Sequence, residues 1–159
     1  QIAAAKGADV TVISRTSRKA EEAKKLGASR TLATTEEEDF FRNHRGEFDL
    51  ILSTISAEYD LEDYLRLLKP RGIMSVVGLP PEALPLRLSR LVGGGKVLTG
   101  NNIGGIAETQ EMLDFCAEHG LGAVIEKVGV DEVDAAYERV VAGDVKFRFV
   151  IDTATFAEH

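Results

Sequence analysis

Short apolar segments that suit buried strands alternate with helix-like segments along this chain. The clearest strand candidate is the run FDLILST at 48–54, which is apolar at nearly every position. Such a run is typical of a parallel strand covered on both faces. Further strands are expected at 9–14, 30–33, 73–77, 96–99, 123–128 and 147–152. Strands separated by helices imply a parallel sheet with right-handed crossovers, so we predict an α/β fold.

Helices are expected between these strands, at 17–26, from Thr34 onward, and at 61–68, 108–118 and 131–142. Thr34 and Glu37 have the spacing of a capping box, which predicts a helix start at Thr34 with Phe40 and Phe41 on its buried side. The first residues, QIAAAKG, are typical of the last turns of a helix that ends at a glycine. We therefore expect the sequence to be part of a longer protein.

Composition excludes several classes of partner. The chain has 159 residues, of which 44% are hydrophobic, so it can bury a core. A net charge of −7 argues against a general nucleic-acid binder, which needs a cationic face. No apolar run approaches the roughly 20 residues that span a bilayer, so we expect no membrane partner. A single cysteine, Cys116, excludes an internal disulfide, and a cytoplasmic location is expected.

A polar, cationic turn follows the first expected strand. Residues 14–19 read SRTSRK, with three hydroxyls and three cations, and no acid stands between Ile13 and Glu21. In a nucleotide-binding parallel sheet the end of the second strand contacts the adenine ribose, and NAD enzymes usually place Asp or Glu there. Ordinary helix caps and surface cations are the alternative interpretation. However, Arg18 and Lys19 in a first helical turn oppose the helix dipole by about 0.3–1 kcal/mol each. A bound dianion removes that conflict, and we predict the 2′-phosphate of NADP.

The first strand and the glycine-rich turn of a dinucleotide-binding domain do not occur in this sequence. Such a domain begins with a strand, G-x-G-x-x-G, and a helix that holds the pyrophosphate. The glycines at 93–95 precede a strand, so we interpret them as a connector. In the strand order 3-2-1-4-5-6 the absent strand is central, which leaves strands 9–14 and 48–54 without a partner between them. We predict that the chain does not fold natively without upstream residues.

Four blocks in this order resemble the cinnamyl-alcohol-dehydrogenase-like branch of the medium-chain zinc alcohol dehydrogenases. They are VGLP at 77–80, IGG at 103–105, ETQEMLDFCAEH at 108–119, and YER, GDV and RFVID within 137–152. The resemblance covers essentially the whole chain. It implies a Rossmann-type doubly wound parallel sheet that lacks its first strand here, within an oxidoreductase of about twice this length.

In that family an N-terminal GroES-like domain holds the catalytic zinc. Hydride passes between NADP(H) and a primary alcohol or aldehyde. The resemblance implies that residues 1–122 are a truncated NADP-binding domain. Residues 123–159 would return to pack on the missing GroES-like domain, and the subunits would form a homodimer with pairing near 100–105. The zinc ligands would lie outside this chain, so no catalytic or metal-binding residue is expected here and the fragment should be inactive by itself.

The resemblance also assigns cofactor contacts residue by residue. They are Ser14, Arg15, Thr16 and Lys19 for the 2′-phosphate; Thr54, Ile55 and Ser56 for the riboses; Val77, Gly78 and Leu79 for the nicotinamide carboxamide; Asn101, Asn102 and Ile103 near the same ring; and Arg148 for the pyrophosphate. Arg15 and Thr16 replace residues that are often serine, and Asn101 replaces an expected serine.

Two other functions stay open from the sequence. One is a zinc-independent quinone or enoyl reductase of the same superfamily, and the other is a non-catalytic nucleotide-binding module. Individual residues also have plain structural interpretations, since strand-end residues such as Thr54 and Val77 occur in cores and Arg148 could form a surface ion pair. Cys116 is interpreted as a small core residue. The three histidines, His44, His119 and His159, are interpreted as solvated.

Overall fold

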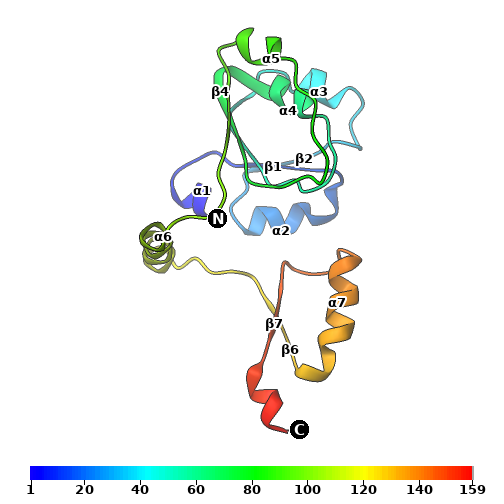
Figure 1. Ribbon diagram of the computed structural model, residues 1–159, viewed down its shortest axis with the longest axis vertical. Coiled ribbons are helices and arrows are strands. Elements are labelled where there is room, and N and C mark those ends of the chain that lie inside the picture. Colours follow the sequence, from blue (N-terminus) through cyan, green and yellow to red (C-terminus); the bar gives the residue numbers. More distant parts are fainter. Residues whose placement is uncertain (159) are drawn as a thin grey trace. The chain divides into compact units, whose positions relative to one another are not determined.

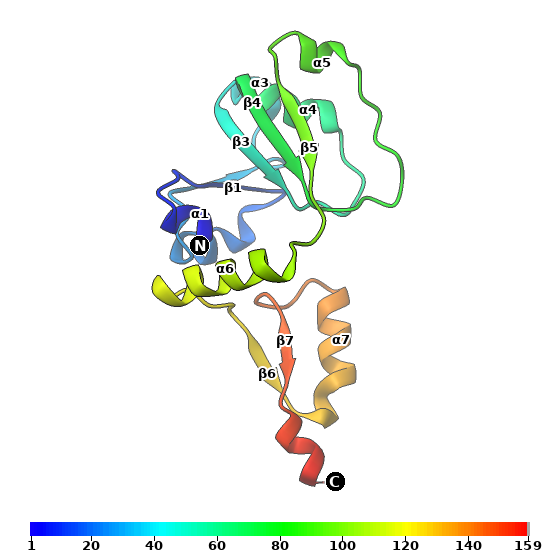
Figure 2. The same ribbon diagram turned by 60° about the vertical axis from the view of Figure 1, so that its left-hand side comes forward.

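The computed structural model describes residues 1–158 and divides into two compact units, Gln1–Thr109 and Gln110–His159. Figures 1 and 2 show the elements from two directions. In the first unit they are α1 (Ile2–Ala5), β1 (Thr11–Ser14), η1 (Ser17–Lys19), α2 (Ala20–Lys25), β2 (Arg30–Ala33), α3 (Phe40–Asn43), β3 (Phe48–Ser53), α4 (Leu61–Leu67), β4 (Leu68–Val76), α5 (Ser89–Val92) and β5 (Val97–Gly100). Then follow α6 (Ile106–Glu118), in whose first turns the division falls, β6 (Glu126–Val128), η2 (Val130–Glu132), α7 (Val133–Val141), β7 (Phe149–Ile151) and η3 (Thr153–Glu158).

Every strand pairing in the described residues is parallel, as the alternation of strands and helices predicted. In the first unit β1 pairs with β2, and β3, β4 and β5 form a three-stranded sheet in that order. In the second unit β6 pairs with β7, and α7 lies between them in the chain. Within the part that the structure describes, β1 and β3 are not hydrogen-bonded neighbours. These are the pairs that remain when the central strand is removed from the order 3-2-1-4-5-6, which confirms the predicted break in the sheet.

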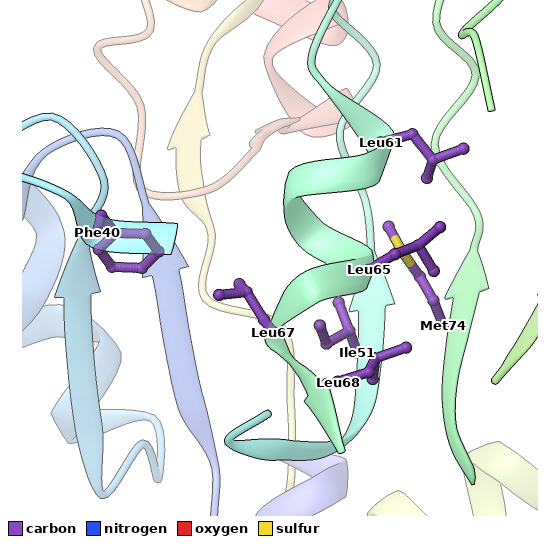
Figure 3. Close-up of a cluster of buried hydrophobic side chains, with 7 residues drawn as sticks. All are labelled: Phe40, Ile51, Leu61, Leu65, Leu67, Leu68 and Met74. Carbon is purple, nitrogen blue, oxygen red and sulfur yellow. The ribbon is translucent and has the colours of Figure 1, made fainter. Parts of the chain in front are cut away.

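The core of the first unit is built from α4 and the start of β4 (Figure 3). The four largest fully buried side chains are Leu65, Leu67, Leu68 and Met74. Phe40, Ile51 and Leu61 complete the buried cluster. The register explains why one face of β3 is covered: Ile51 pairs with Met74, and both are buried.

The other face of β3 departs from the prediction. Leu50 and Leu52 are each 62% exposed, so in this chain the strand alternates between a covered and an open face. The expectation that 48–54 is covered on both faces was therefore wrong for the chain as described. Leu50 and Leu52 are exposed because only one face of β3 is covered by other residues in this chain.

The predicted helix at Thr34 was also wrong. Residues 34–39 form turns, and α3 begins only at Phe40, after Asp39 in the left-handed region with φ 55°. The reason is that these residues form hydrogen bonds outside the expected first helical turn. The Thr34 amide donates to the Ser14 carbonyl, and the Glu37 carboxylate bonds to Asn43 and His44. The hydrogen bonds of Thr34 and Glu37 to these partners are formed in place of the expected capping box.

His44 is not solvated, which corrects another expectation. Its side chain is only 15% exposed, and its two ring nitrogens lie 2.6 Å from the Glu47 carboxylate and 3.0 Å from the Glu37 carboxylate. Burial lowers the pKa of His44, but hydrogen bonds to the two carboxylates outweigh burial and raise the pKa overall. His119 is exposed as predicted, whereas His159 lies outside the described residues.

The remaining boundaries agree with the prediction in place more than in length. β2 has the predicted bounds, α4 ends one residue early, and β4 starts earlier than predicted because it follows α4 directly. Cys116 is half-buried, with its thiol 3.6 Å from the sulfur of Met112. Among the described residues, no helix is both long and apolar enough to cross a bilayer.

Candidate functional site

Three of the predicted contact groups lie together at one edge of the three-stranded sheet. Ser53 pairs with Val76, and Val76 pairs with Gly100, so residues 54–56, 77–79 and 101–103 leave the sheet side by side. The carboxyl ends of parallel strands form the ligand-binding edge of open α/β sheets. The structure therefore brings these nine residues to the edge at which the sequence predicted a ligand.

Hydrogen bonds hold these groups to the ends of the neighbouring strands and join the first group to the second. The amides of Val77 and Gly78 both donate to the Ser53 carbonyl, at 2.9 and 3.1 Å. The amide of Leu79 lies 3.4 Å from the hydroxyl of Ser56. On the other side, the Asn101 amide donates to the Val76 carbonyl at 3.3 Å. The loops are thus held to one another as well as to the sheet.

Gly78 is the point of closest approach. A Cβ built at this position would lie 2.2 Å from the carbonyl oxygen of Ile55 and 2.7 Å from the carbonyl carbon of Thr54. Real Cβ atoms do not approach backbone atoms so closely. A glycine is therefore required where the segment at 77–79 crosses the segment at 54–56. Gly78 itself is buried, while Leu79 is 80% exposed. This close crossing packs the segment after β4 directly against the segment after β3.

The cationic turn follows β1, in the neighbouring two-stranded sheet. The side chains of Ser14, Arg15, Thr16 and Lys19 are all exposed. Thr16 has extended backbone angles and precedes η1, so the turn directs the chain from the strand into the helical segment. Hydroxyls, a guanidinium and an ammonium group in a short exposed turn form a donor set for an anion.

An acid that the sequence did not predict lies beside this turn. Glu36, in the loop after β2, accepts a hydrogen bond from the amide of Ser17 at 2.9 Å. The hydrogen bonds with Ser17 hold the pKa of the Glu36 carboxyl below its ordinary value. A signal was available, because β1 and β2 are neighbours and the residues that follow them meet at the same edge.

Glu62 is a second residue that sequence analysis missed. Its carboxylate accepts hydrogen bonds from the backbone amide and the guanidinium of Arg87, and from Arg90 Nε at 2.9 Å. These bonds, first to Arg87 and then to Arg90, lower the pKa of Glu62 well below its ordinary value. The cluster ties the long β4–β5 connection to α4. It thereby anchors the segment that begins with residues 77–79.

Arg148, the remaining predicted contact, belongs to the second unit. It is exposed and immediately precedes β7, and its carbonyl oxygen accepts a hydrogen bond from the Glu126 amide at 3.0 Å. Nearby, Arg139 bonds to Glu126 at 2.8 Å and lies over the ring of Phe149.

The described residues offer no metal centre. Over residues 1–158, no group of three or more His, Cys, Asp or Glu side chains is arranged to hold a metal ion. The donors gathered at the strand ends are hydroxyls, cations and backbone groups. The site as described is suited to binding and orienting a polar ligand.

Comparison with known proteins gives the family. The sequence model of the zinc-binding dehydrogenases matches residues 1–118. The NADP-dependent alcohol dehydrogenase C of Mycobacterium bovis is 49% identical over 152 residues, which are 96% of this chain and 44% of that protein. The chain thus spans less than half the length of this curated relative.

Solved structures agree with this family. A cinnamyl alcohol dehydrogenase from Sorghum bicolor matches with a TM-score of 0.84 and 42% identity, over 91% of this chain and 41% of that one. CAD from Helicobacter pylori, complexed with NADP(H), matches with a TM-score of 0.80 and 36% identity, over 93% of this chain and 42% of that one. The chain has the fold of the cofactor-binding part of these enzymes, and it belongs to the zinc-binding dehydrogenases, in their cinnamyl-alcohol-dehydrogenase-like branch.

Proposed function

We propose that this chain is the cofactor-binding part of an NADP-dependent zinc alcohol dehydrogenase that interconverts primary alcohols and aldehydes. The observation that carries the proposal is the exposed turn at 14–19, which places hydroxyls and cations directly after a parallel strand. The similarity to an NADP-dependent alcohol dehydrogenase and to a structure complexed with NADP(H) supports the choice of cofactor.

The residues present fit NADP(H) at both of the strand edges. Arg15 and Lys19 supply positive charge for the 2′-phosphate, and Ser14 and Thr16 supply hydroxyl donors. At the other edge, the glycine at 78 allows the segments 54–56 and 77–79 to lie in direct contact, which brings two groups of proposed cofactor contacts together.

NADP(H), when bound, supplies or accepts the hydride, and the polarising zinc would be held outside this chain. The residues of this chain bind and orient. In our proposal residues 54–56 contact the riboses, residues 77–79 and 101–103 position the nicotinamide, and Arg148 reaches the pyrophosphate. Glu62 acts indirectly. By bonding to Arg87, it holds in place the β4–β5 connection, which begins with residues 77–79.

The domain division and the assembly belong to the same proposal. Residues 1–122 would form the NADP-binding domain, and residues 123–159 would return to pack on a GroES-like catalytic domain. We propose a cytoplasmic homodimer, with pairing near residues 100–105. The chain alone is expected to be inactive, because catalysis would require the zinc ligands of the other domain.

A charge swap tests the cofactor assignment. Ser14→Asp combined with Arg15→Ala and Lys19→Ala, made in the full-length gene product, should shift the ratio of kcat/KM for NADPH and NADH toward NADH. A carboxylate accepts hydrogen bonds from the ribose hydroxyls and repels the 2′-phosphate. Lys25→Ala, at the far end of α2, is the matched control for lost positive charge. An unchanged ratio would refute the assignment.

Two further measurements separate the competing functions. Zinc content of the full-length protein distinguishes a zinc alcohol dehydrogenase from a zinc-independent quinone or enoyl reductase. Turnover of NADPH with an aldehyde distinguishes both enzymes from a non-catalytic nucleotide-binding module.

A further inference from the structure

The loop after β2 is fastened to the cationic turn after β1. The Thr34 amide donates to the Ser14 carbonyl at 2.9 Å. Thr35 bonds to the Arg15 carbonyl twice, through its amide at 3.1 Å and its hydroxyl at 2.6 Å. These three hydrogen bonds, made by two successive residues, fix the direction of the loop. The next residue, Glu36, therefore lies beside the turn in a defined position.

Glu36 places a negative charge beside this cationic turn. Its Oε1 accepts from the Ser17 amide at 2.9 Å, and the side chain is exposed to water. Because its pKa is lowered by the bonds to Ser17, the carboxylate is ionised at neutral pH. One hydrogen-bond donor of the turn, the Ser17 amide, is therefore already bonded to an anionic group of the protein itself.

An internal carboxylate and a 2′-phosphate would conflict in two ways. They compete for the Ser17 amide, and they repel each other as like charges. Two unit charges about 4 Å apart in a water-exposed site repel by an energy equivalent to roughly a fivefold change in affinity. NAD, which has a hydroxyl in place of the phosphate, would not meet this repulsion.

We propose that Glu36 is a specificity-determining residue that weakens binding of the 2′-phosphate, and so keeps the preference for NADP over NAD below what the cations of the turn could provide. The inference rests on the proposed function, since it assumes that residues 14–19 bind the 2′-phosphate. A purely structural role for Glu36, as a cap that supports the turn, predicts the opposite sign, because removing the charge would then weaken NADP.

The test measures the dissociation constants of NADP+ and NAD+ by titration calorimetry on the full-length gene product. Glu36→Gln removes the charge but keeps an oxygen that can accept from Ser17, and Glu36→Ser is a second neutral variant in case the first does not fold. Glu38→Gln is the matched control, because Glu38 is exposed in the same loop and its contact with Asn43 is made by its backbone carbonyl. Lys19→Ala tests the underlying site independently.

Glu36→Gln should tighten NADP+ about fivefold and change NAD+ less than twofold, with Glu38→Gln changing neither by more than twofold. If Glu36→Gln leaves NADP+ unchanged, weakens it, or tightens both cofactors equally, while Lys19→Ala selectively weakens NADP+, the role of Glu36 is refuted and the proposed function stands. If Lys19→Ala does not discriminate between the cofactors, the site and the inference fail together.

Discussion

The close backbone crossing at Gly78 leads to the sharpest stability prediction. Replacing Gly78 with Ala adds one methyl group where three backbone atoms of Thr54 and Ile55 lie between 2.2 and 2.7 Å away. Backbone atoms cannot move aside as the end of a flexible side chain can. The two loops must therefore separate by about 1 Å to restore ordinary contact distances.

The hydrogen bonds at the crossing indicate how much that separation costs. The Ser53 carbonyl accepts from both Val77 and Gly78, and a shift of this size takes both bonds beyond hydrogen-bonding distance. Two lost bonds contribute about 1–3 kcal/mol, and overpacking contributes about 1–3 kcal/mol. The smaller entropy of the unfolded alanine variant offsets about 0.4–1 kcal/mol. We expect a net loss of roughly 3 kcal/mol in the free energy of unfolding.

Urea unfolding of the full-length gene product measures this loss. Gly122→Ala is the control, because a Cβ at Gly122 meets nothing within 4 Å and the same change in the unfolded chain applies. The affinity for NADP+ should also fall in the Gly78 variant, since the loops at 54–56 and 77–79 move apart. If Gly78→Ala is no less stable than Gly122→Ala, the argument from close approach is refuted.

Three other predictions follow from burial, protonation and the break in the sheet. Leu65→Ala, at a fully buried position, should lower the free energy of unfolding by about 2–5 kcal/mol in urea, whereas Leu88→Ala, at a side chain 70% exposed, should change it by less than about 0.5 kcal/mol. The raised pKa of His44 stabilises the fold below pH 6.5, its ordinary pKa, and this contribution is lost as the pH rises through the folded-state pKa. His44→Gln should flatten that part of the plot of unfolding free energy against pH. An unchanged plot would contradict the pairing of His44 with the two carboxylates. In this chain by itself, hydrogen exchange should be faster in β1 and β3 than in β4, which is paired on both sides, and strong protection in both β1 and β3 would show that the chain folds without a strand between them.

Local pattern was a good guide wherever neighbouring residues decide the structure. The strand at 30–33 has the predicted bounds, and the apolar runs at 48–54 and 73–77 both became paired parallel strands. These features follow from alternation and apolar content, which are properties of short segments. The pairs that remain when one central strand is missing were predicted instead from the strand order 3-2-1-4-5-6 of a dinucleotide-binding sheet.

Local pattern failed where hydrogen bonds made in the folded chain replace the expected first helical turn. The Thr34–Glu37 spacing is a sound helix-start signal, yet the amide of Thr34 bonds to Ser14 and the carboxylate of Glu37 bonds to His44. His44 itself was predicted to be solvated because it lies in a polar segment at a helix end and has no partner at the spacing of a metal site. Its environment comes from two carboxylates brought together by the fold.

The candidate site divides in the same way. The sequence by itself determined which residues follow the strands. It therefore placed hydroxyls and cations at 14–19, and hydroxyl, aliphatic, glycine and amide residues at 54–56, 77–79 and 101–103, at strand ends. Only the tertiary structure placed the carboxylate of Glu36 on the amide of Ser17 and required a glycine at 78. The physical reason is that strand ends are specified by local apolar patterning, whereas a hydrogen bond across 19 residues or a steric conflict between two loops exists only once the parallel strands have set those loops side by side.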